Sequence, residues 1–238
     1  MNLILFERGE IERPLTTNDS RTRHVREVLG KKSGESFDCG LVNGPRGKAR
    51  IVRTDGNGMH LAFEWGSPPP AADPVVLLIG LPRPQTARKI LGEAASLGVA
   101  GIFFFPAEKS ERSYASSHLW ATDEVQRLLR AGVAQAFCTR IPACELVSSL
   151  DAAIATTEGT PTRVALDNYE STVALSQVPV LGKSAVLAVG SERGWSVRER
   201  EILREAAFSL AHLGPRVLRT ETAAVAGLVL LKSRLGLL

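Results

Sequence analysis

The sequence predicts an α/β protein whose mostly parallel sheet carries helices on both faces, with a small β-barrel preceding it. Short strand-like segments with Gly and Asn turns come before residue 66, and apolar strands alternate with helical segments after residue 72. The seam Gly66–Ala72 lies between them, and its proline triplet continues neither a helix nor a central strand, because proline lacks the backbone donor. We therefore expect one domain over residues 1–70 and a second over residues 71–238.

The first domain is expected to hold one helix, near residues 20–29, and three short strands. Its turns at Asn43–Gly47 and Asp55–Gly58 are rich in residues that favour tight reversals of the chain. The strands are expected at Ser36–Val42, Ala49–Thr54 and Met59–Trp65. Short strands joined by such turns are typical of a small barrel.

The second domain alternates strands with helices, which favours a parallel sheet. Strands are expected at Val75–Leu81, Gly101–Phe105, Arg163–Leu166, Ala185–Val189 and Phe208–Leu213. Helices are expected at Gln85–Leu97, Asp123–Ala136, Val197–Ala207 and from Ala223 to Leu231. Ser196 is followed three residues later by Glu199, a capping box that marks the start of the third of these helices.

The composition is that of an ordinary globular protein, with 44% apolar and 23% charged residues among 238. A net charge of +4 permits a polyanionic partner without demanding one. Basic residues are nevertheless concentrated in two segments, Arg21–Lys32 and Asn43–Arg53. At this point both a solvated surface and a polyanion-binding surface remain open for them.

Several classes of protein and site are not expected. The three cysteines, Cys39, Cys138 and Cys144, have no metal-type spacing, so we expect free thiols in a reducing cytoplasm. No run reaches about 18 apolar residues, so no membrane span is expected. No GxGxxG follows a strand, and the four histidines at 24, 60, 118 and 212 are scattered, which disfavours a dinucleotide site, a metal cluster and a His-based triad.

Two polar loops remain as candidate sites. Gly190–Trp195 and Leu213–Ala223 each follow an apolar strand and precede a helix, and each sets an acid and an arginine beside glycine. Polar groups between two buried elements need partners. Because ligands bind outside the carboxyl ends of parallel strands, the two loops are expected to converge on one pocket.

These two loops, GSERGW and LGPRVLRTETA, resemble those of the RsmE-type ribosomal RNA uridine-N3 methyltransferases of the SPOUT superfamily. The resemblance extends over nearly the whole chain. It also includes RHVREVL (residues 23–29), LVNGPRGKARIV (41–52), LPRPQTARKILGEAASLGV (81–99) and EKSERSY (108–114). It implies a PUA-like RNA-binding barrel, a trefoil-knotted catalytic domain, a homodimer and S-adenosylmethionine as cofactor.

The resemblance also implies which residues bind the cofactor. The expected residues are Leu166, Asp167, Val189, Gly190, Ser191, Glu192, Gly194, Leu213, Gly214, Pro215, Val217, Leu218, Thr220, Thr222 and Ala223. Uridine N3 carries a weakly acidic proton, so a cation and a proton acceptor would both assist methylation. Arg219 is expected to steer the base or stabilise its anion, and Glu221 or Glu192 to accept the proton or anchor a loop.

The RNA is expected to meet basic side chains in both domains. Phosphate contacts are expected from Arg21, Arg23, Arg26, Arg46 and Lys48. Arg83, Arg88 and Arg112 are expected to line the path towards the cofactor, and Arg140 is a further expected RNA-binding residue. Arg216 is expected to brace the knot, and His24 to lie on the barrel surface.

The chain departs from the family pattern at two places. Ser191 and Arg193 replace the proline and a glycine of the common GPEGG loop. In an EQ-x-GR-like stretch, Ala134 and Cys138 replace the glutamate and the arginine, for which Arg140 is a substitute. Two alternatives therefore remain open, a non-catalytic RNA-binding or ribosome-assembly protein of the same fold and a methyltransferase with another RNA target.

Overall fold

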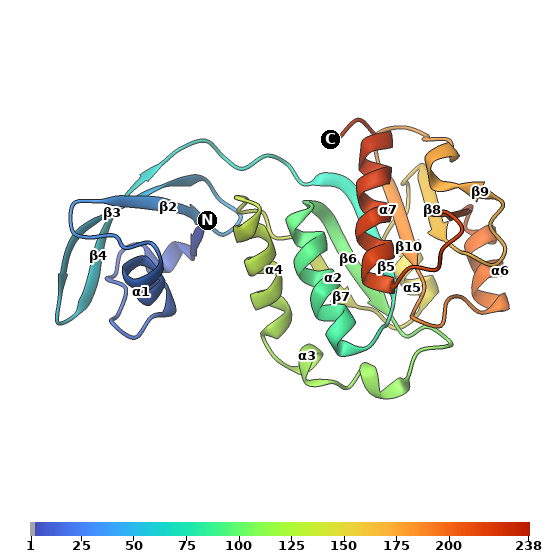
Figure 1. Ribbon diagram of the computed structural model, residues 1–238, viewed down its shortest axis with the longest axis horizontal. Coiled ribbons are helices and arrows are strands. Elements are labelled where there is room, and N and C mark those ends of the chain that lie inside the picture. Colours follow the sequence, from blue (N-terminus) through green and yellow to red (C-terminus); the bar gives the residue numbers. More distant parts are fainter. Residues whose placement is uncertain (1–2) are drawn as a thin grey trace. The chain divides into compact units, whose positions relative to one another are not determined.

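The computed structural model describes residues 3–238, which form two compact units (Figure 1). One unit contains the residues up to Ala71 together with Val133–Ile141, and the other contains Ala72–Gly132 and Pro142–Leu238. The chain therefore passes from one unit to the other three times. The segment Val133–Ile141, which the sequence analysis assigned to the second domain, packs with the first.

The N-terminal unit is built on a four-stranded sheet in the order β1-β2-β3-β4. The strands are β1 (Ile4–Phe6), β2 (Ser36–Leu41), β3 (Arg46–Asp55) and β4 (Gly58–Trp65). The β1–β2 pair is parallel and the other two pairs are antiparallel. The core between these strands and the helical turn includes Phe6, Val25, Phe37 and Met59. The three expected strands are confirmed, and closure of the sheet into a barrel stays a prediction.

The helix expected near residues 20–29 is shorter than predicted. α1 covers Ser20–Arg23 and begins at Asp19, whose carboxylate accepts the Arg21 N–H. A wider, π-type turn over His24–Val28 then continues the helical path, with Val25 fully buried. A further short 3₁₀ turn lies at Arg8–Glu10.

The second unit contains a seven-stranded, wholly parallel sheet in the order β7-β6-β5-β10-β8-β11-β9. The strands are β5 (Asp73–Gly80), β6 (Val99–Phe105), β7 (Ala143–Leu146), β8 (Thr162–Leu166), β9 (Val173–Ala174), β10 (Ala185–Val189) and β11 (Ser209–His212). The central strand β10 is buried along its whole length, as its apolar sequence requires. The expected α/β architecture is confirmed, while the trefoil knot stays a prediction.

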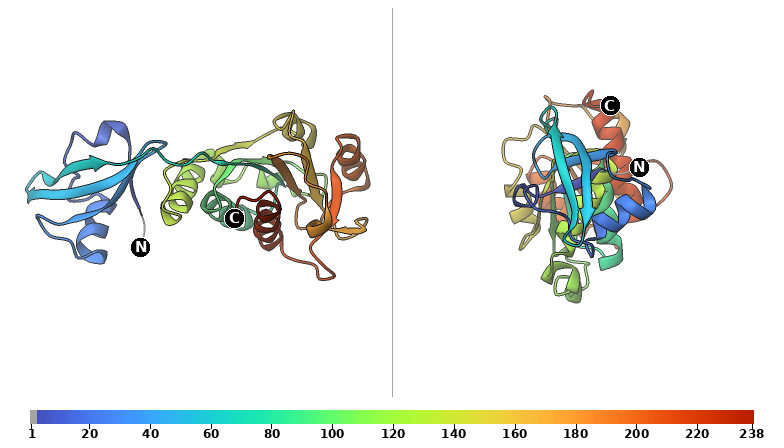
Figure 2. Two further views of the ribbon diagram at one scale, coloured as in Figure 1. Left: turned by 90° about the horizontal axis from the view of Figure 1, so that it is seen from above. Right: turned by 90° about the vertical axis from the view of Figure 1, so that its left-hand side faces the viewer.

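Helices cover both faces of this sheet (Figure 2). α2 (Pro84–Ser96) and α7 (Thr220–Arg234) pack together on one face, and α5 (Leu150–Ala155) and α6 (Val197–Glu205) lie on the other. The remaining helices are α3 (His118–Ala121) and α4 (Glu124–Gln135), with 3₁₀ turns at Arg112–Tyr114 and Leu175–Gln177. α4 approaches α2 closely, because a Cβ on Gly132 would lie 2.3 Å from the Gly92 carbonyl oxygen.

The segment Val133–Ile141 enters the N-terminal unit as α4 ends. Phe137 has φ 53° and the Cys138 N–H bonds back to the Val133 carbonyl, which closes the helix. The Thr139 hydroxyl donates to the Gly44 carbonyl at 2.5 Å, and the Ile141 N–H donates to Asn43 Oδ1 at 2.9 Å. These bonds fix the turn between β2 and β3.

None of the helices formed by residues 3–238 is long and apolar enough to cross a membrane. The loops that matter below all leave the carboxyl ends of β5, β6, β8, β10 and β11. Because these strands are parallel, those ends lie at one edge of the sheet.

Candidate functional site

Loops from three neighbouring strands enclose a cavity of about 130 Å³. Its wall consists of the end of β8 and the loop after it (Leu166, Asn168 and Tyr169), the end of β10 and the loop after it (Val189–Gly194), and the loop after β11 with the start of α7 (Val217, Leu218, Thr220 and Ala223). The predicted convergence of the two polar loops is therefore confirmed, and the loop after β8 joins them. A smaller void of about 20 Å³ continues from it towards Ala211, Leu213 and Arg216.

The loop after β10 is compact because of its glycines and Trp195. A Cβ on Gly190 would lie 3.1 Å from the Gly194 carbonyl carbon, and Gly194 itself has φ +66°. The buried Trp195 indole donates to the Leu166 carbonyl at 2.8 Å. This bond ties the loop after β10 to the end of β8.

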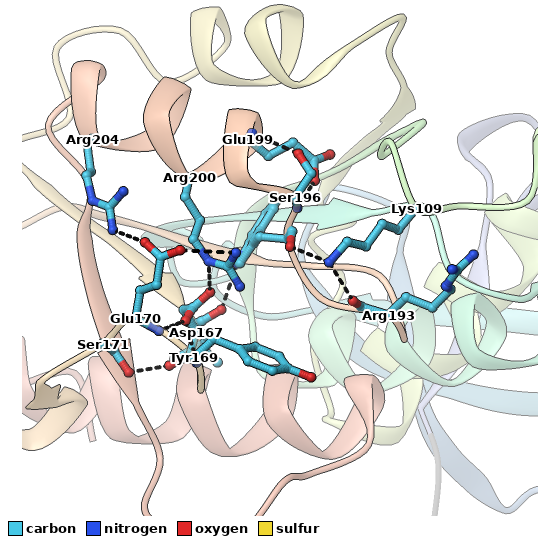
Figure 3. Close-up of polar contacts among 12 residues, drawn as sticks. Lys109, Asp167, Tyr169, Glu170, Ser171, Arg193, Ser196, Glu199, Arg200 and Arg204 are labelled. Carbon is cyan, nitrogen blue, oxygen red and sulfur yellow. Dashed lines mark hydrogen bonds and ion pairs between the residues drawn. The ribbon is translucent and has the colours of Figure 1, made fainter.

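Two side chains from outside the loop hold it in place (Figure 3). Lys109 Nζ donates to the Trp195 carbonyl at 2.7 Å and lies 3.4 Å from the Arg193 carbonyl oxygen. The Glu199 carboxylate accepts the Ser196 N–H at 2.8 Å, which confirms the predicted capping box, and its other oxygen accepts the Glu108 N–H at 2.9 Å. The stretch EKSERSY thus supports the cavity from the carboxyl end of β6.

A buried ion pair shapes the loop after β8 (Figure 3). The Asp167 carboxylate accepts the Tyr169 and Glu170 N–H groups at 2.6 Å and the Arg200 Nε–H at 2.6 Å. Burial alone would raise the pKa of Asp167, but the hydrogen bonds from Glu170, Arg200 and Tyr169 together lower it. The Arg200 guanidinium also lies 5.5 Å from the centre of the Tyr169 ring. Arg204 adds a further pair with Glu170.

Tyr169 is a residue that the sequence analysis missed. Its side chain is 78% exposed and lines the cavity. The Asp167 side chain, by contrast, is committed to the ion pair and does not line the cavity, so any contact with a ligand falls to its neighbours. A signal for Tyr169 in the sequence is its place two residues after Asp167, the acid that directly follows β8.

A second and larger cavity, of about 500 Å³, adjoins the first. It is lined by Arg83, Gln85, Thr86 and Lys89 from the start of α2 and by Glu192 and Val217–Glu221. The two cavities share Glu192, Val217, Leu218 and Thr220. Gln85, Thr86 and Lys89 were not singled out from the sequence, although they follow the carboxyl end of β5, where ligands are expected.

The two candidate proton acceptors have different surroundings. Glu221 accepts a hydrogen bond from its own N–H and pairs with Lys89 Nζ at 3.0 Å, and these contacts lower its pKa. Glu192 Oε1 accepts the Arg83 N–H at 2.9 Å, which fixes the carboxylate on the wall that the two cavities share.

The basic residues nearest the cavities differ in their partners. A hydrogen bond from Arg83 to the Tyr114 hydroxyl raises the pKa of Arg83. Arg193, Arg216 and Arg219 are exposed, and no hydrogen bond or ion pair with another described side chain engages them. Arg219 also occupies the position just before the first turn of α7.

Besides Asp167, four of the predicted cofactor contacts lie outside the first cavity: Leu213, Gly214, Pro215 and Thr222, of which Leu213 borders the smaller void. Gly214 and Pro215 do not line it, and Gly214 instead donates its N–H to His212 Nδ1 at 3.1 Å. Thr222 faces a separate hollow of about 350 Å³ between α2 and α7. A cofactor role for these residues stays a prediction.

The predicted RNA-binding residues fall into two groups. Arg23, Arg26 and Arg112 are exposed, and their side chains make no hydrogen bond or ion pair with another of residues 3–238. The others have partners: Arg21 pairs with Glu10 and Asp19, Lys48 with Asp38, Arg88 with Glu124, and Arg46 and Arg140 donate to the carbonyls of Phe137 and Pro70.

Arg21 is the most strongly engaged member of this set. Its two partners and the Phe6 ring, 5.0 Å away, surround its guanidinium, and the side chain is 24% exposed. Its hydrogen bonds to Glu10 raise its pKa. These contacts argue against the predicted phosphate contact for Arg21.

No group of three or more His, Cys, Asp or Glu side chains within residues 3–238 is arranged to hold a metal ion. Burial raises the pKa of the Cys39 and Cys144 thiols to about 12, so neither is a ready nucleophile.

Comparison with known proteins identifies the family. The sequence model of the RNA methyltransferase domain matches residues 69–232. Ribosomal RNA small subunit methyltransferase E of Treponema pallidum is 33% identical over 235 residues, which cover 95% of this chain and 88% of that protein. The chain belongs to this RNA methyltransferase family.

A second relative and a solved structure resemble the chain over nearly its whole length. Ribosomal RNA small subunit methyltransferase E 1 of Borreliella burgdorferi is 26% identical and covers 99% of both chains. The crystal structure of a ribosomal RNA small subunit methyltransferase E from Neisseria gonorrhoeae, bound to S-adenosyl methionine, has a TM-score of 0.76 and covers 98% of both chains at 19% identity. The latter similarity shows that the two proteins share a fold.

Proposed function

We propose that this protein transfers a methyl group from S-adenosylmethionine to N3 of a uridine in the 16S RNA of the small ribosomal subunit. The observation that carries the proposal is the pair of adjoining cavities that share one wall, in a member of an RNA methyltransferase family. The smaller cavity is lined by the glycine-containing loop after β10, which suits a cofactor, and the larger cavity has the volume and the charged side chains to bind a base. The names of the Treponema and Borreliella relatives support the choice of ribosomal RNA.

The residues of the first cavity fit the cofactor. The loop Val189–Gly194 lines this cavity, and a Cβ on Gly190 would lie only 3.1 Å from the Gly194 carbonyl carbon, so the backbone of this loop packs closely upon itself beside the cavity. The Ser191 hydroxyl is buried and has no hydrogen-bond partner among the described residues, so a polar ligand group would satisfy it. S-adenosylmethionine, when bound, supplies a methyl group already activated by its sulfonium.

The chain's own task is then to hold the base and remove its proton. Glu192 is the better placed of the two acceptors, because its carboxylate stands between the cavities while that of Glu221 is held by Lys89 and by its own N–H. N3 passes its proton to Glu192 and takes the methyl group, and the negative charge that develops on the ring meets Arg219 and Arg83.

The RNA strand is held by basic side chains on both units. Arg23, Arg26 and Arg112 are the strongest candidates for phosphate contacts, because each is exposed and its side chain makes no hydrogen bond or ion pair with another of residues 3–238. We also propose, on the family resemblance, that the protein is a homodimer, which light scattering after gel filtration tests.

Two measurements test the proposal. Calorimetric titration with S-adenosylmethionine is expected to show binding, and its absence would favour the non-catalytic RNA-binding alternative. Mass spectrometry of ribosomal RNA nucleosides from a deletion strain is expected to show the loss of one 3-methyluridine, restored by the intact gene. If every 3-methyluridine is retained, the assigned substrate is wrong.

A further inference from the structure

We infer that the larger cavity holds the uracil ring and that Gln85 and Thr86, at the start of α2, recognise its oxygens. This inference rests on the proposed function, because it takes the adjoining cavity as that of the cofactor. Both residues line this cavity, and neither side chain makes a hydrogen bond with another of residues 3–238.

The two cavities are placed for transfer from one to the other. They share Glu192 and the loop residues Val217, Leu218 and Thr220, so groups bound in each meet across this wall. The larger one has about 500 Å³, which is ample for a nucleoside. Val217 is 80% exposed, an unusual position for an aliphatic side chain and a suitable surface for the flat face of a base.

The start of α2 offers hydrogen-bond donors that find no acceptor among residues 3–238. Arg83 precedes the helix without a capping side-chain bond, and Pro84 at its first position has no N–H. The N–H groups of Gln85 and Thr86 are therefore left without an acceptor inside the helix. Their own amide and hydroxyl groups add two more donors.

The start of α7 faces the same cavity but is already neutralised. Glu221 lies in its first turn and accepts a hydrogen bond from its own N–H, and Lys89 pairs with the same carboxylate. A hydrogen-bond acceptor on the ligand therefore finds free donors on the α2 side of the cavity and a carboxylate on the α7 side. This difference orients the ligand, with its acceptor atoms towards α2.

The donors on α2 match the chemistry of uracil. The ring has two carbonyl oxygens, one on each side of N3, and removal of the N3 proton spreads negative charge over both. Hydrogen bonds from Gln85 and Thr86 to an oxygen therefore strengthen as the anion forms, and the positive end of the helix dipole acts in the same sense. Cytosine has an amino group in place of one of these oxygens. This amino group is a hydrogen-bond donor and would face the donors of Gln85 and Thr86, so cytosine binds less well than uracil.

The experiment compares Gln85→Ala and Thr86→Val with Gln126→Ala, an exposed glutamine on α4 that serves as the matched control. Calorimetry gives the Kd for S-adenosylmethionine, and methyl transfer to small-subunit ribosomal RNA gives KM and kcat. Each variant at the start of α2 is expected to lower kcat/KM by about 3- to 10-fold, the value of one hydrogen bond. The Kd for the cofactor is expected to stay unchanged, as are all constants of the control.

A further variant, Gln85→Glu, turns the donor into an acceptor and adds a negative charge. It is expected to lower kcat/KM by more than Gln85→Ala does, and to reduce the preference for uridine over cytidine at the target position. If Gln85→Ala and Thr86→Val raise the Kd for S-adenosylmethionine as much as they lower kcat/KM, the cavity holds part of the cofactor. If both variants leave kcat/KM unchanged, neither residue recognises the base. Either result overturns the inference. Wild-type protein that neither binds S-adenosylmethionine nor transfers methyl would instead refute the proposed function itself.

Discussion

Two carboxylates border the cavity where we place the base, and their neighbours give them different chemistry. The Glu221 carboxylate accepts a hydrogen bond from its own N–H at the start of α7 and pairs with Lys89. These contacts lower the pKa of Glu221 and make it a weaker base. Glu192 gives one oxygen to the Arg83 N–H and keeps the other available. The sequence places both residues in polar segments that follow apolar strands and cannot rank them, because the ranking depends on partners more than a hundred residues away in sequence.

We expect Glu192→Gln to lower kcat by about 10²- to 10⁴-fold, the usual contribution of a positioned general base. Glutamine retains the oxygen that accepts the Arg83 N–H, so the loop is expected to keep its position. The residual rate is expected to climb with pH, since hydroxide then removes the N3 proton. Single-turnover methyl transfer measures both effects.

Glu221→Gln is the matched comparison for this prediction, because it makes the same chemical change at the same cavity. It removes an ion pair with a half-exposed lysine and is expected to lower kcat by less than about tenfold. If Glu221→Gln proves the more damaging of the two, the assignment of the proton acceptor to Glu192 is wrong.

At the scale of elements, the loops at one edge of the sheet are held by side chains that come from elsewhere. Lys109 and Glu199 hold the loop after β10, and Arg200 holds the loop after β8 (Figure 3). Such contacts keep a binding site in its required geometry while the loops themselves stay short. The two ends of α6 contribute differently, because its first turn carries Glu199 and Arg200 and its last turn carries Arg204.

We expect Asp167→Asn to lower the free energy of unfolding by about 3 kcal/mol at neutral pH, because it removes the buried carboxylate that pairs with the buried Arg200 guanidinium and leaves it only the more exposed Glu170 carboxylate, 3.4 Å away. The lowered pKa of Asp167 fixes the sign of the pH dependence. The native carboxylate contributes its full stability above its unfolded pKa, near 4, and loses it as the pH falls through the lower folded value. The difference between wild type and variant should therefore shrink below about pH 4.

Urea unfolding followed by the fluorescence of the three tryptophans measures this difference, since Trp195 is buried in the same unit. Asp151→Asn, at an exposed carboxylate on α5, serves as the control and is expected to change the stability little. The Kd for S-adenosylmethionine should rise in Asp167→Asn, because Tyr169 lines the cavity. A difference that persists unchanged at pH 3 would contradict the proposed role of the charge.

The sequence predicts the strands and helices that carry a strong apolar pattern or a helix cap, and it does not predict those that lack such a local signal. The apolar strands β5, β8 and β10 and the capped helix α6 were found, because buried runs and caps are local signals. The edge strands β7 and β9 are short and half-exposed, and pairing with a neighbour defines them. The convergence of the two polar loops is likewise predicted from the sequence, because both follow apolar strands. Gln85 and Tyr169 are identified as site residues only by the cavities that they line in the structure.

For the molecule as a whole, the division of the chain differs from the simple two-domain order that the proline seam indicates. Residues 133–141 belong with the N-terminal unit, although more than sixty residues separate them from it in sequence. This segment is also where Ala134 and Cys138 depart from the family pattern. Ala134 contributes its backbone carbonyl to Leu3, so its side chain is free to vary without loss of this contact.

This division predicts that residues 1–71 are incomplete as a folding unit. Six hydrogen bonds join them to the segment Val133–Ile141, among them Leu3 N–H to the Ala134 carbonyl and Asn43 N–H to the Thr139 carbonyl. At about 0.5–1.5 kcal/mol for each bond, their loss removes roughly 3–9 kcal/mol. A domain of this size commonly has only about 5–10 kcal/mol of stability in total.

We therefore expect a fragment of residues 1–71 to melt at a much lower temperature than the same fragment joined to residues 133–141 through a flexible Gly/Ser linker. A linker ending in a scrambled version of the nine residues is the control, because it adds the same length and composition without the paired geometry. Circular dichroism melting curves compare the three. Residues 1–71 would be a self-sufficient domain if all three fragments melted together, and the packing of Thr139 against Gly40 and Gly44 would then be unimportant for stability.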